Sequence, residues 1–337
     1  MDSKRILVTG GCGFIGSNFI HHMRASFPHR IVNLDKLTYA GNLENLKGID
    51  DQPGYSFVRG DIAETSDLES IFDKGVDLVI NFAAESHVDR SIIDPDAFVK
   101  TNIYGTYRLL EQARKSGIEK FLQVSTDEVY GSLGTTGKFR EDTAMAPNSP
   151  YSASKASADM LVMAYHKTFG LPVCITRCSN NYGPYQFPEK LIPLLITNAM
   201  EGRDLPIYGD GMNVRDWIHV KDHCAAIAIV AEKGKAGEIY NIGAENERTN
   251  MEIVELILEI MGKPRELIKY VKDRPGHDRR YAIDNTKIRD QLGFEITVPF
   301  KTGMEETIRW YVENRPWWER IKTGEYLQYY HRWYGQR

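Results

Sequence analysis

A glycine-rich segment between a short apolar run and a helical pattern limits most strongly what this chain can fold into. Gly11, Gly13 and Gly16 have the spacing G-x-G-x-x-G shortly after the apolar residues 6–8, and Gly10 extends the pattern. Glycines at such positions permit a tight turn, a close approach of the backbone to a pyrophosphate and close packing of helix on strand. The free N–H groups of the helix N-terminus add a site for phosphate. A glycine turn without a nucleotide is the alternative, but the order strand, loop, helix favours a dinucleotide-binding unit.

A carboxylate at the end of the next apolar run supports this interpretation. Asp35 lies 19 positions after Gly16. A carboxylate there accepts hydrogen bonds from the adenosine ribose hydroxyls and repels a 2′-phosphate, so we expect NAD rather than NADP as the cofactor. Lys36, the next residue, weakens that preference slightly.

Apolar runs alternate with helical patterns through the first half of the chain, which is typical of parallel βαβ units. Strands are expected at residues 5–8, 30–34, 55–59, 78–82, 121–125 and 173–177, and helices at 16–26, 67–74, 97–116 and 152–169. Further helices are expected at 189–201, 222–232 and 251–261. The pattern predicts an α/β fold with a doubly wound parallel (Rossmann) sheet, whose ligands lie at the carboxyl ends of the strands. We expect an NAD-binding Rossmann domain over 1–180 and a smaller C-terminal substrate-binding lobe over 181–337, some segments of which return to the main domain.

The composition excludes several classes of protein. A net charge of -4 gives no general attraction to nucleic acid or to anionic membranes, so neither is expected as a partner. The four cysteines form no Cys-x-x-Cys pair and have no histidine cluster nearby, which favours free thiols in a reducing compartment and no metal site. The first apolar run ends at once in Thr9 and Gly10, so it has no signal-peptide core, and no segment is long enough to span a bilayer. We expect a cytoplasmic protein.

Tyr151 and Lys155 form the first candidate catalytic pair. They stand four positions apart on an expected helix, so they share one face. A nearby ammonium favours the phenolate and lowers the tyrosine pKa towards neutrality, which suits a general base. Such a pair is often an ordinary surface feature. Here it follows a Pro147–Pro150 turn downstream of the nucleotide loop, which favours a functional role.

Asp127 and Glu128 form the second candidate pair, directly after the strand expected at 121–125. Two carboxylates in surroundings that separate their pKa values can act as an acid and a base. A solvated acidic loop is the ordinary explanation of two adjacent acids. Their place at the cofactor-facing edge of the sheet favours catalysis.

The motif Thr126-Asp127-Glu128-Val129-Tyr130-Gly131 resembles that of the nucleotide-sugar 4,6-dehydratases of the extended short-chain dehydrogenase family, most closely the dTDP-glucose 4,6-dehydratases. The similarity covers essentially the whole chain and includes residues 35–42, 84–91, 179–184 and 273–278. It implies conversion of dTDP-glucose to dTDP-4-keto-6-deoxyglucose, with NAD regenerated in each turnover. The catalytic residues would be Thr126, Asp127, Glu128, Tyr151 and Lys155.

The resemblance also assigns a role to each catalytic side chain. Tyr151 takes the proton of the sugar 4-hydroxyl, which Thr126 orients, while NAD accepts hydride from carbon 4. Glu128 removes the proton from carbon 5, Asp127 protonates the departing 6-hydroxyl, and hydride returns to carbon 6. Lys155 supports Tyr151 and the nicotinamide ribose.

Further residues are expected to bind the two ligands. The residues expected to bind NAD are Gly10, Gly13, Phe14, Ile15, Gly16, Asp35, Lys36, Leu37, Thr38, Asp61, Ile62, Ala83, Ala84, Glu85, Ser86, Thr101, Tyr151, Lys155 and Asn181. The residues expected to bind substrate are His87, Thr126, Asn180, Lys190, Leu191, Pro206, Ile207, Tyr208, Arg215, Asn250, Arg274 and His277. Of these, Arg215 and Arg274 suit a diphosphate, because a guanidinium can bind two phosphate oxygens at once.

Two other functions share much of this pattern. A nucleotide-sugar 4-epimerase or decarboxylase would have the glycine loop and the Tyr151 pair but not both Asp127 and Glu128. A non-catalytic dinucleotide-binding sensor would need neither pair. No residue excludes a UDP-, CDP- or GDP-linked sugar. The resemblance also implies a homodimer formed through the helices expected at 97–116 and 152–169.

Overall fold

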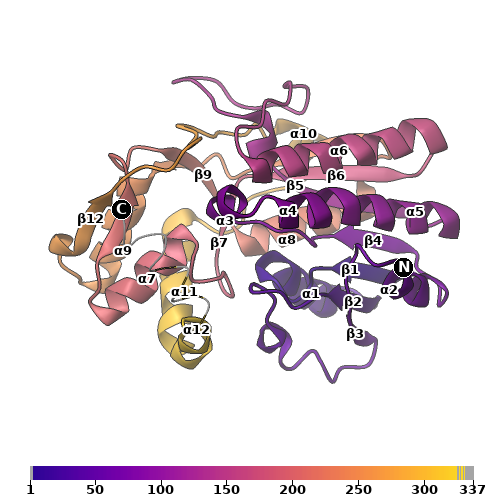
Figure 1. The fold of residues 1–337 in the computed structure, drawn as a ribbon, viewed down its shortest axis with the longest axis horizontal. Coiled ribbons are helices and arrows are strands. Elements are labelled where there is room, and N and C mark those ends of the chain that lie inside the picture. The colour runs from indigo at the N-terminus through magenta and orange to yellow at the C-terminus, as the bar shows by residue number, and fades with distance from the viewer. Residues whose placement is uncertain (1–2, 325, 327, 329, 331–337) are drawn as a thin grey trace.

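Seven parallel strands form the central sheet of the computed structural model (Figure 1), which describes residues 3–324, 326, 328 and 330. In sheet order they are β3 (Tyr55–Arg59), β2 (Arg30–Asp35), β1 (Arg5–Thr9), β4 (Leu78–Asn81), β5 (Lys120–Thr126), β6 (Val173–Cys178) and β10 (Glu238–Ile242). This is the order of a doubly wound fold extended by one strand. The expected fold class is confirmed, and the six predicted strands are present with ends shifted by at most one residue.

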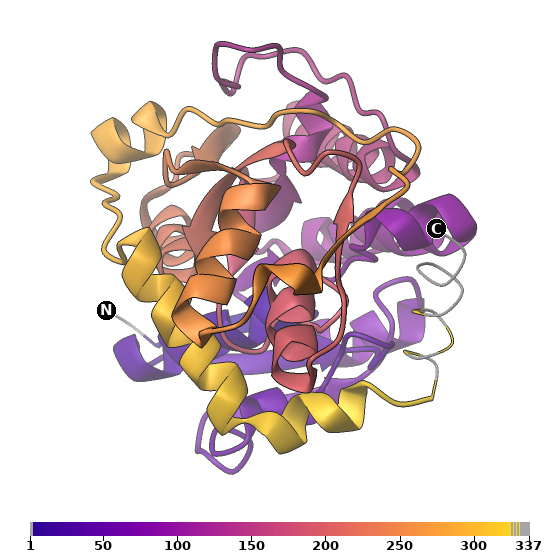
Figure 2. The same cartoon turned by 90° about the vertical axis from the view of Figure 1, so that its left-hand side faces the viewer.

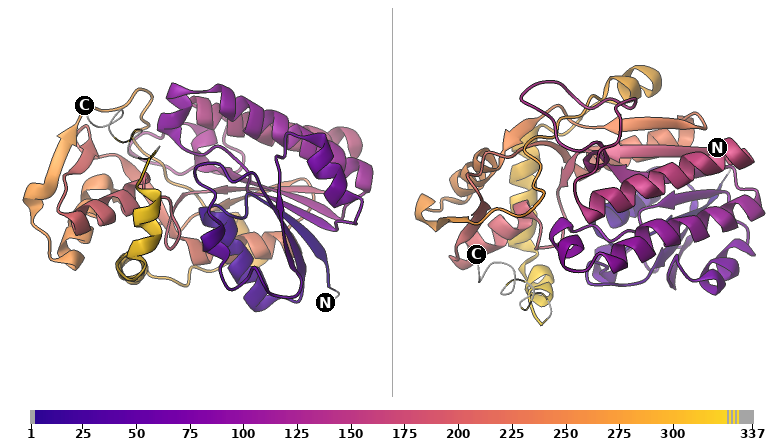
Figure 3. Two further views of the ribbon diagram at one scale, coloured as in Figure 1. Left: turned by 60° about the horizontal axis from the view of Figure 1, so that its bottom comes forward. Right: turned by 45° about the horizontal axis from the view of Figure 1, so that its top comes forward.

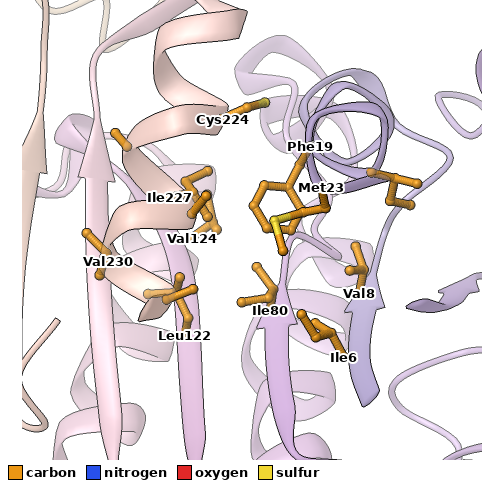
Figure 4. Close-up of a cluster of buried hydrophobic side chains, with 14 of the residues drawn as sticks. Ile6, Val8, Phe19, Met23, Ile80, Leu122, Val124, Cys224, Ile227 and Val230 are labelled. Atoms are coloured by element: carbon orange, nitrogen blue, oxygen red, sulfur yellow. The ribbon is translucent and has the colours of Figure 1, made fainter. Parts of the chain in front are cut away.

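Helices cover both faces of this sheet, which explains why its strands are apolar without alternation. One face carries α1 (Phe14–Ser26), α8 (Val220–Lys233) and α10 (Thr286–Leu292), and the other carries α2 (Thr65–Phe72), α5 (Thr106–Ser116) and α6 (Pro150–Phe169). Figure 4 shows Phe19 and Met23 of α1 over Ile80 and Val8 of the strands, and Ile227 of α8 beside Val124 of β5. Burial of each such side chain contributes about 1.5–3 kcal/mol. Figure 3 shows α5 and α6 side by side over the opposite face.

The segment expected as one helix over 97–116 differs in the structure. It comprises α4 (Asp96–Phe98), a π-helical stretch η2 (Val99–Gly105) and then α5. The wider turn coincides with buried Asn102, whose side chain bonds to the backbone of Glu85 and to Ser154 instead of facing solvent. π-helical turns are often found at functional sites, and this one lies beside the cleft described below.

A second, smaller core lies beyond the carboxyl ends of the strands, and Figure 2 views the molecule from that side. Its helices are α7 (Leu191–Glu201), α9 (Asn250–Met261), α11 (Phe300–Glu313) and α12 (Arg315–Ile321). Its strands are β7 (Asn180–Tyr182), β9 (Val214–His219) and β11 (Glu247–Thr249) in one sheet, and β8 (Leu205–Tyr208) and β12 (Ile268–Val271) in another. Short helices complete the chain: η1 (Leu43–Leu46), α3 (Val88–Ile93), η3 (Asp127–Tyr130) and η4 (Arg265–Leu267).

The three helices expected after residue 180 are present as α7, α8 and α9. Helix α7 begins two residues later than expected, because Lys190 has an extended backbone and serves as its N-cap. Helix α8 and strand β10 pack into the central sheet although they follow residue 180. None of the helices in the described part of the chain is long and apolar enough to cross a membrane.

Candidate active site

A large cleft opens at the carboxyl edge of the central sheet, on both sides of the boundary between the neighbouring strands β1 and β4. The chain continues from β1 and from β4 towards opposite edges of the sheet, and doubly wound folds bind their ligands at such a boundary. The empty volume is about 1750 Å³, solvent at the mouth included. The glycine loop, the ends of β2, β4, β5 and β6, the start of α6 and the segment before α7 line the cleft.

The glycine loop forms a cradle of exposed backbone at the start of α1. Gly10 has a φ of 69°, and a Cβ atom there would lie 2.7 Å from the backbone nitrogen of Ala83. A Cβ atom at Gly16 would lie 2.3 Å from the carbonyl oxygen of Gly10. Gly13 is the N-cap of α1 and has no side chain to cap the first turn, which also contains no acidic residue. The N–H groups of this turn therefore suit a pyrophosphate, so the loop fits a dinucleotide.

Asp35 provides the acidic end of the same cleft. It is buried, and its two oxygens accept backbone hydrogen bonds from Cys12 (2.8 Å) and Leu37 (2.7 Å). Each carboxylate oxygen can accept a further bond, so Asp35 retains capacity for ribose hydroxyls. Burial raises the pKa of Asp35, and the two N–H groups oppose that shift. Leu37 has a φ of 57° and does not line the cleft, so it shapes this turn.

Lys36 does not weaken the acidic character of this end. Its ammonium lies 2.7 Å from Asp61, which also accepts a hydrogen bond from the N–H of Ala63. Burial opposes ionisation of Asp61, but the Lys36 and Ala63 contacts hold its pKa below the ordinary value. The lysine charge is thus compensated within the protein, and the site keeps the features that favour NAD over NADP.

All the residues predicted to bind NAD, with the exception of Leu37, line the cleft. The hydrogen bonds of one residue in η2, beside the cleft, help to fix their positions. Asn102 in η2 accepts from the N–H of Glu85 (2.9 Å) and donates to its carbonyl (3.0 Å), which fixes the segment that follows β4. The same amide donates to Ser154 on α6 (2.8 Å), next to Lys155. The cofactor segment and the helix of the predicted base are therefore linked through one side chain.

The five predicted catalytic residues all line the cleft. Strand β5 ends at Thr126, whose hydroxyl accepts from the N–H of Glu128 and so caps the short helix η3. Helix α6 begins with Pro150 at its first turn and a reciprocal capping box between Ser149 and Ser152. These two helix starts place Tyr151 within hydrogen-bonding contact of Thr126. The end of β5 and the start of α6, which are separate in the sequence, therefore meet at one place in the cleft.

Asp127 and Glu128 occupy different electrostatic surroundings. Burial raises the pKa of Asp127 well above its ordinary value, Glu128 and Asp216 raise it further, and the charge of Arg215 opposes the shift. Burial also raises the pKa of Glu128, but the charges of Arg274, Lys190 and Arg215 all oppose it. Oδ2 of Asp127 is buried and has no hydrogen-bond partner among the described residues. Asp127 is suited to be a neutral acid, and Glu128 is suited to be the base.

The expectation for Tyr151 is wrong in one respect. Lys155 is buried and donates to the carbonyl of Val124 (2.7 Å), while burial, Glu128 and other groups raise the pKa of Tyr151 well above its ordinary value. Burial also lowers the pKa of Lys155. The hydrogen bond from Thr126 favours ionisation of Tyr151, but the groups of the chain itself do not bring its pKa towards neutrality.

The predicted substrate residues divide into two groups. Thr126, Asn180, Lys190 and Leu191 line the cleft, whereas the others do not line it: His87, Pro206, Ile207, Tyr208, Arg215, Asn250, Arg274 and His277. Pro206, Ile207 and Tyr208 belong to β8, Arg215 to β9 and Asn250 to the first turn of α9, while Arg274 and His277 follow β12 and His87 precedes α3.

Arg215 is buried with little to compensate its charge. Its guanidinium donates to the carbonyls of Val214 (2.7 Å) and Asp278 (2.8 Å) and lies 4.2 Å above the ring of Tyr281. Among the described residues, no carboxylate forms an ion pair with it. Carbonyl oxygens orient the group without neutralising it, so Arg215 can bind an anion.

Several residues at the site were not among the predicted ones. Asp216 raises the pKa of Asp127, and Asp89 bonds to both Tyr208 and Arg274. Asp216 follows Arg215, and Asp89 lies shortly after His87, both in segments already singled out in the sequence. Their proximity to these predicted residues was the sequence feature that could have identified them. The described residues contain no group of three or more His, Cys, Asp and Glu side chains arranged to hold a metal ion.

The parallel doubly wound sheet, the glycine cradle, the Tyr151 pair and the two adjacent acids in the cleft together define a short-chain dehydrogenase of the kind that modifies nucleotide sugars. The chain belongs to the GDP-mannose 4,6 dehydratase family, whose model matches residues 7–307. A dTDP-glucose 4,6-dehydratase of Xanthomonas campestris is 52% identical over 339 residues, with 95% of this chain and 96% of the relative covered.

Two solved structures of dTDP-glucose 4,6-dehydratases have the same fold. That from Bacillus anthracis, in complex with NAD, is 54% identical with a TM-score of 0.90 and covers 95% of this chain and 100% of its own. That from Streptomyces venezuelae, with NAD and dTDP bound, is 50% identical with a TM-score of 0.93, covering 94% and 100%. The expected similarity to this group of enzymes is confirmed.

Proposed function

We propose that the chain converts dTDP-glucose to dTDP-4-keto-6-deoxyglucose with NAD as its cofactor. The observation that carries this proposal is the pair of acids at the end of β5, buried Asp127 and partly buried Glu128, beside Tyr151. Elimination of water across carbons 5 and 6 requires one acid and one base, and two carboxyl groups in different electrostatic surroundings can supply both. The relatives at about half identity, which are named as enzymes of this reaction, support the same substrate.

Oxidation at carbon 4 is the first step. Tyr151 accepts the proton of the 4-hydroxyl, and Thr126, which contacts the phenol, orients that hydroxyl. When bound, NAD supplies a hydride acceptor, a positive charge that favours the phenolate, and the hydride that later returns to carbon 6. Lys155, held by the Val124 carbonyl, lies on the same helix face and is placed for the nicotinamide ribose.

Elimination follows, because a ketone at carbon 4 acidifies the proton on carbon 5. Glu128 has three cations in its surroundings that favour its ionised form, so it removes this proton. Asp127 is kept neutral by burial and by the charges of Glu128 and Asp216, so it donates its proton to the departing 6-hydroxyl. The burial of Asp127 and the partial burial of Glu128 limit the access of bulk water to these proton transfers.

The test is the mass of the product. Purified protein incubated with dTDP-glucose should release a nucleotide sugar that is lighter by one water. A product of unchanged mass but altered stereochemistry would indicate a 4-epimerase. Loss of carbon dioxide from a UDP-glucuronate substrate would indicate a decarboxylase, and absence of turnover with every nucleotide sugar would indicate a sensor.

The assembly belongs to the same proposal. Tyr104, Met160 and Phe169 are 46%, 54% and 53% exposed on η2 and α6, and such apolar groups on neighbouring helices suit a homodimer formed by η2, α5 and α6 of two copies. Light scattering should give a mass near twice the 38.4 kDa of one chain. A mass of one chain, or a dimer unaffected by Met160→Glu, would contradict this arrangement.

The remaining expectations stand as proposals. We infer that residues 1–180 bind NAD and 181–337 bind the nucleotide sugar, with β10 and α8 completing the NAD-binding part. Four buried free cysteines suit a reducing compartment, so we propose a cytoplasmic location.

A further inference from the structure

The segment from Ser86 to Arg90 connects the cofactor side of the cleft with the second core. It follows the predicted NAD-binding residues after β4 and leads into α3, which Figure 1 shows between the central sheet and the smaller lobe. The carbonyl of Ser86 accepts from Lys190 (2.8 Å), and Arg90 binds Glu189 (2.9 Å). Successive residues of one short segment therefore hold groups that come from the other side of the cleft.

Asp89 makes the most complete set of these contacts. Its Oδ1 accepts from Nη1 of Arg274 (2.8 Å), and its Oδ2 accepts from the hydroxyl of Tyr208 (3.0 Å). The residue is only 2% exposed. Burial opposes its ionisation, but Arg274, His87 and Tyr208 hold the pKa of Asp89 below the ordinary value, so it is a carboxylate.

Arg274 depends on this carboxylate for its position. It lies between the end of β12 and the start of α10, on a stretch without helix or strand. Its guanidinium carbon lies 5.9 Å from the centre of the Tyr208 ring, and its Nε is buried without a hydrogen-bond partner among the described residues. The charge of Arg274 also favours the ionised form of Glu128, so the arginine faces the chemical end of the site.

Arg215 shows the contrast. Its guanidinium is oriented by the backbone carbonyls of Val214 in β9 and of Asp278 in the loop after β12, and no acid of the described residues forms an ion pair with it. The guanidinium of Arg274 is held by the side chain of Asp89 instead, because loop backbone restricts a side chain less.

We propose that Asp89 is a positioning residue that holds Arg274 and Tyr208 in place to bind the nucleoside diphosphate of the substrate. This rests on the proposed function. Asp89 touches neither the sugar nor the cofactor in this account. Asp89 acts through the guanidinium of Arg274, whose Nη1 it binds. The Nε of Arg274 has no hydrogen-bond partner among the described residues, so it remains as a donor for the ligand.

Asp89→Asn tests the proposal without changing side-chain volume. An amide has one acceptor oxygen where Asp89 uses two, so either Arg274 or Tyr208 loses its partner. We expect KM for dTDP-glucose to rise by about tenfold, the scale seen when the partner that orients a binding residue is removed. The kcat value and the NAD content should remain near those of the wild type. Asp210→Asn, which breaks the exposed pair with Arg279, is the matched control and should change neither constant.

A double-variant comparison shows whether Asp89 acts through Arg274. Arg274→Gln should raise KM by itself, and adding Asp89→Asn should raise it little further. Fully additive effects would overturn the proposal, as would an Asp89→Asn enzyme with unchanged KM or one that loses kcat alone. If Asp89→Asn does not fold, Asp89→Glu decides: it keeps the charge but displaces the guanidinium, so KM must rise, and unchanged KM overturns the proposal. A wild type that does not dehydrate dTDP-glucose would refute the proposed function instead.

Discussion

Asp127→Asn removes the proton donor from the elimination step and leaves the shape of the site nearly unchanged. Asp127 is 2% exposed, and burial together with Glu128 and Asp216 raises its pKa well above the ordinary value, which favours the protonated acid; one of its oxygens has no hydrogen-bond partner among the described residues. Loss of a positioned general acid slows a proton-dependent step by about 10²–10⁴-fold. Oxidation at carbon 4, which uses Tyr151 and Thr126, should be slowed far less.

Single-turnover kinetics separate the two steps. With the wild type, NADH formed in the oxidation is consumed when hydride returns to carbon 6. With Asp127→Asn, the near-ultraviolet absorbance of NADH should appear at close to the wild-type rate and then persist, while quenched samples contain the 4-keto sugar that still has its 6-hydroxyl. Equal slowing of NADH formation and decay would refute the acid role of Asp127. Asp210→Asn, which breaks an exposed ion pair with Arg279, controls for a general loss of activity.

Other consequences concern the base, the phenol, the glycine loop and stability. Glu128→Gln should abolish uptake of solvent deuterium at carbon 5 while NADH still forms; retained uptake would exclude Glu128 as the base. Tyr151→Phe should slow NADH formation itself by about 10²–10⁴-fold, and normal NADH formation in a single turnover would contradict that role. Gly16→Ala places a methyl group 2.3 Å from a backbone oxygen. For an overpacking cost of about 1–3 kcal/mol, NAD affinity measured by titration should fall about tenfold. Unchanged affinity would show that the loop relaxes freely. Folding raises the pKa of Asp127 above its ordinary 3.8, so the folded protein holds a proton that the unfolded chain releases. Asp127 therefore lowers stability increasingly as pH rises above that value. Asp127→Asn should raise the melting temperature at neutral pH but not at acid pH, and a lower melting temperature at neutral pH would contradict the pKa shift.

The positions of the chemical groups could be predicted because each one stands at a local boundary in the chain. Asp35 and Thr126 end apolar runs, and Gly16 opens a helical pattern, so strand ends and helix starts were readable without any knowledge of the fold. Parallel strands bring their carboxyl ends to one edge, and the cleft follows from that rule. The catalytic roles of these residues remain predictions that the experiments above address.

Contacts between distant residues could not be predicted, because no local pattern encodes them. Asp89 meets Arg274 across 185 positions and Tyr208 across 119. The π-helical turn was hidden for a similar reason, since it accompanies the bonds of Asn102 to a separate segment. The spacing of Tyr151 and Lys155 on one helix face was correct. However, burial and the charge of Glu128 raise the pKa of the phenol, opposite to the expectation, and the ammonium of Lys155 binds a carbonyl on β5.

The path of one hydrogen tests the central claim most directly. With dTDP-glucose deuterated at carbon 4, the account predicts a product that has lost one water and has the deuterium at carbon 6, because NAD takes the hydride and returns it within one turnover. Nuclear magnetic resonance of the product locates the label. Deuterium that remains at carbon 4, in a sugar that has kept its water, would contradict a dehydratase and indicate an epimerase.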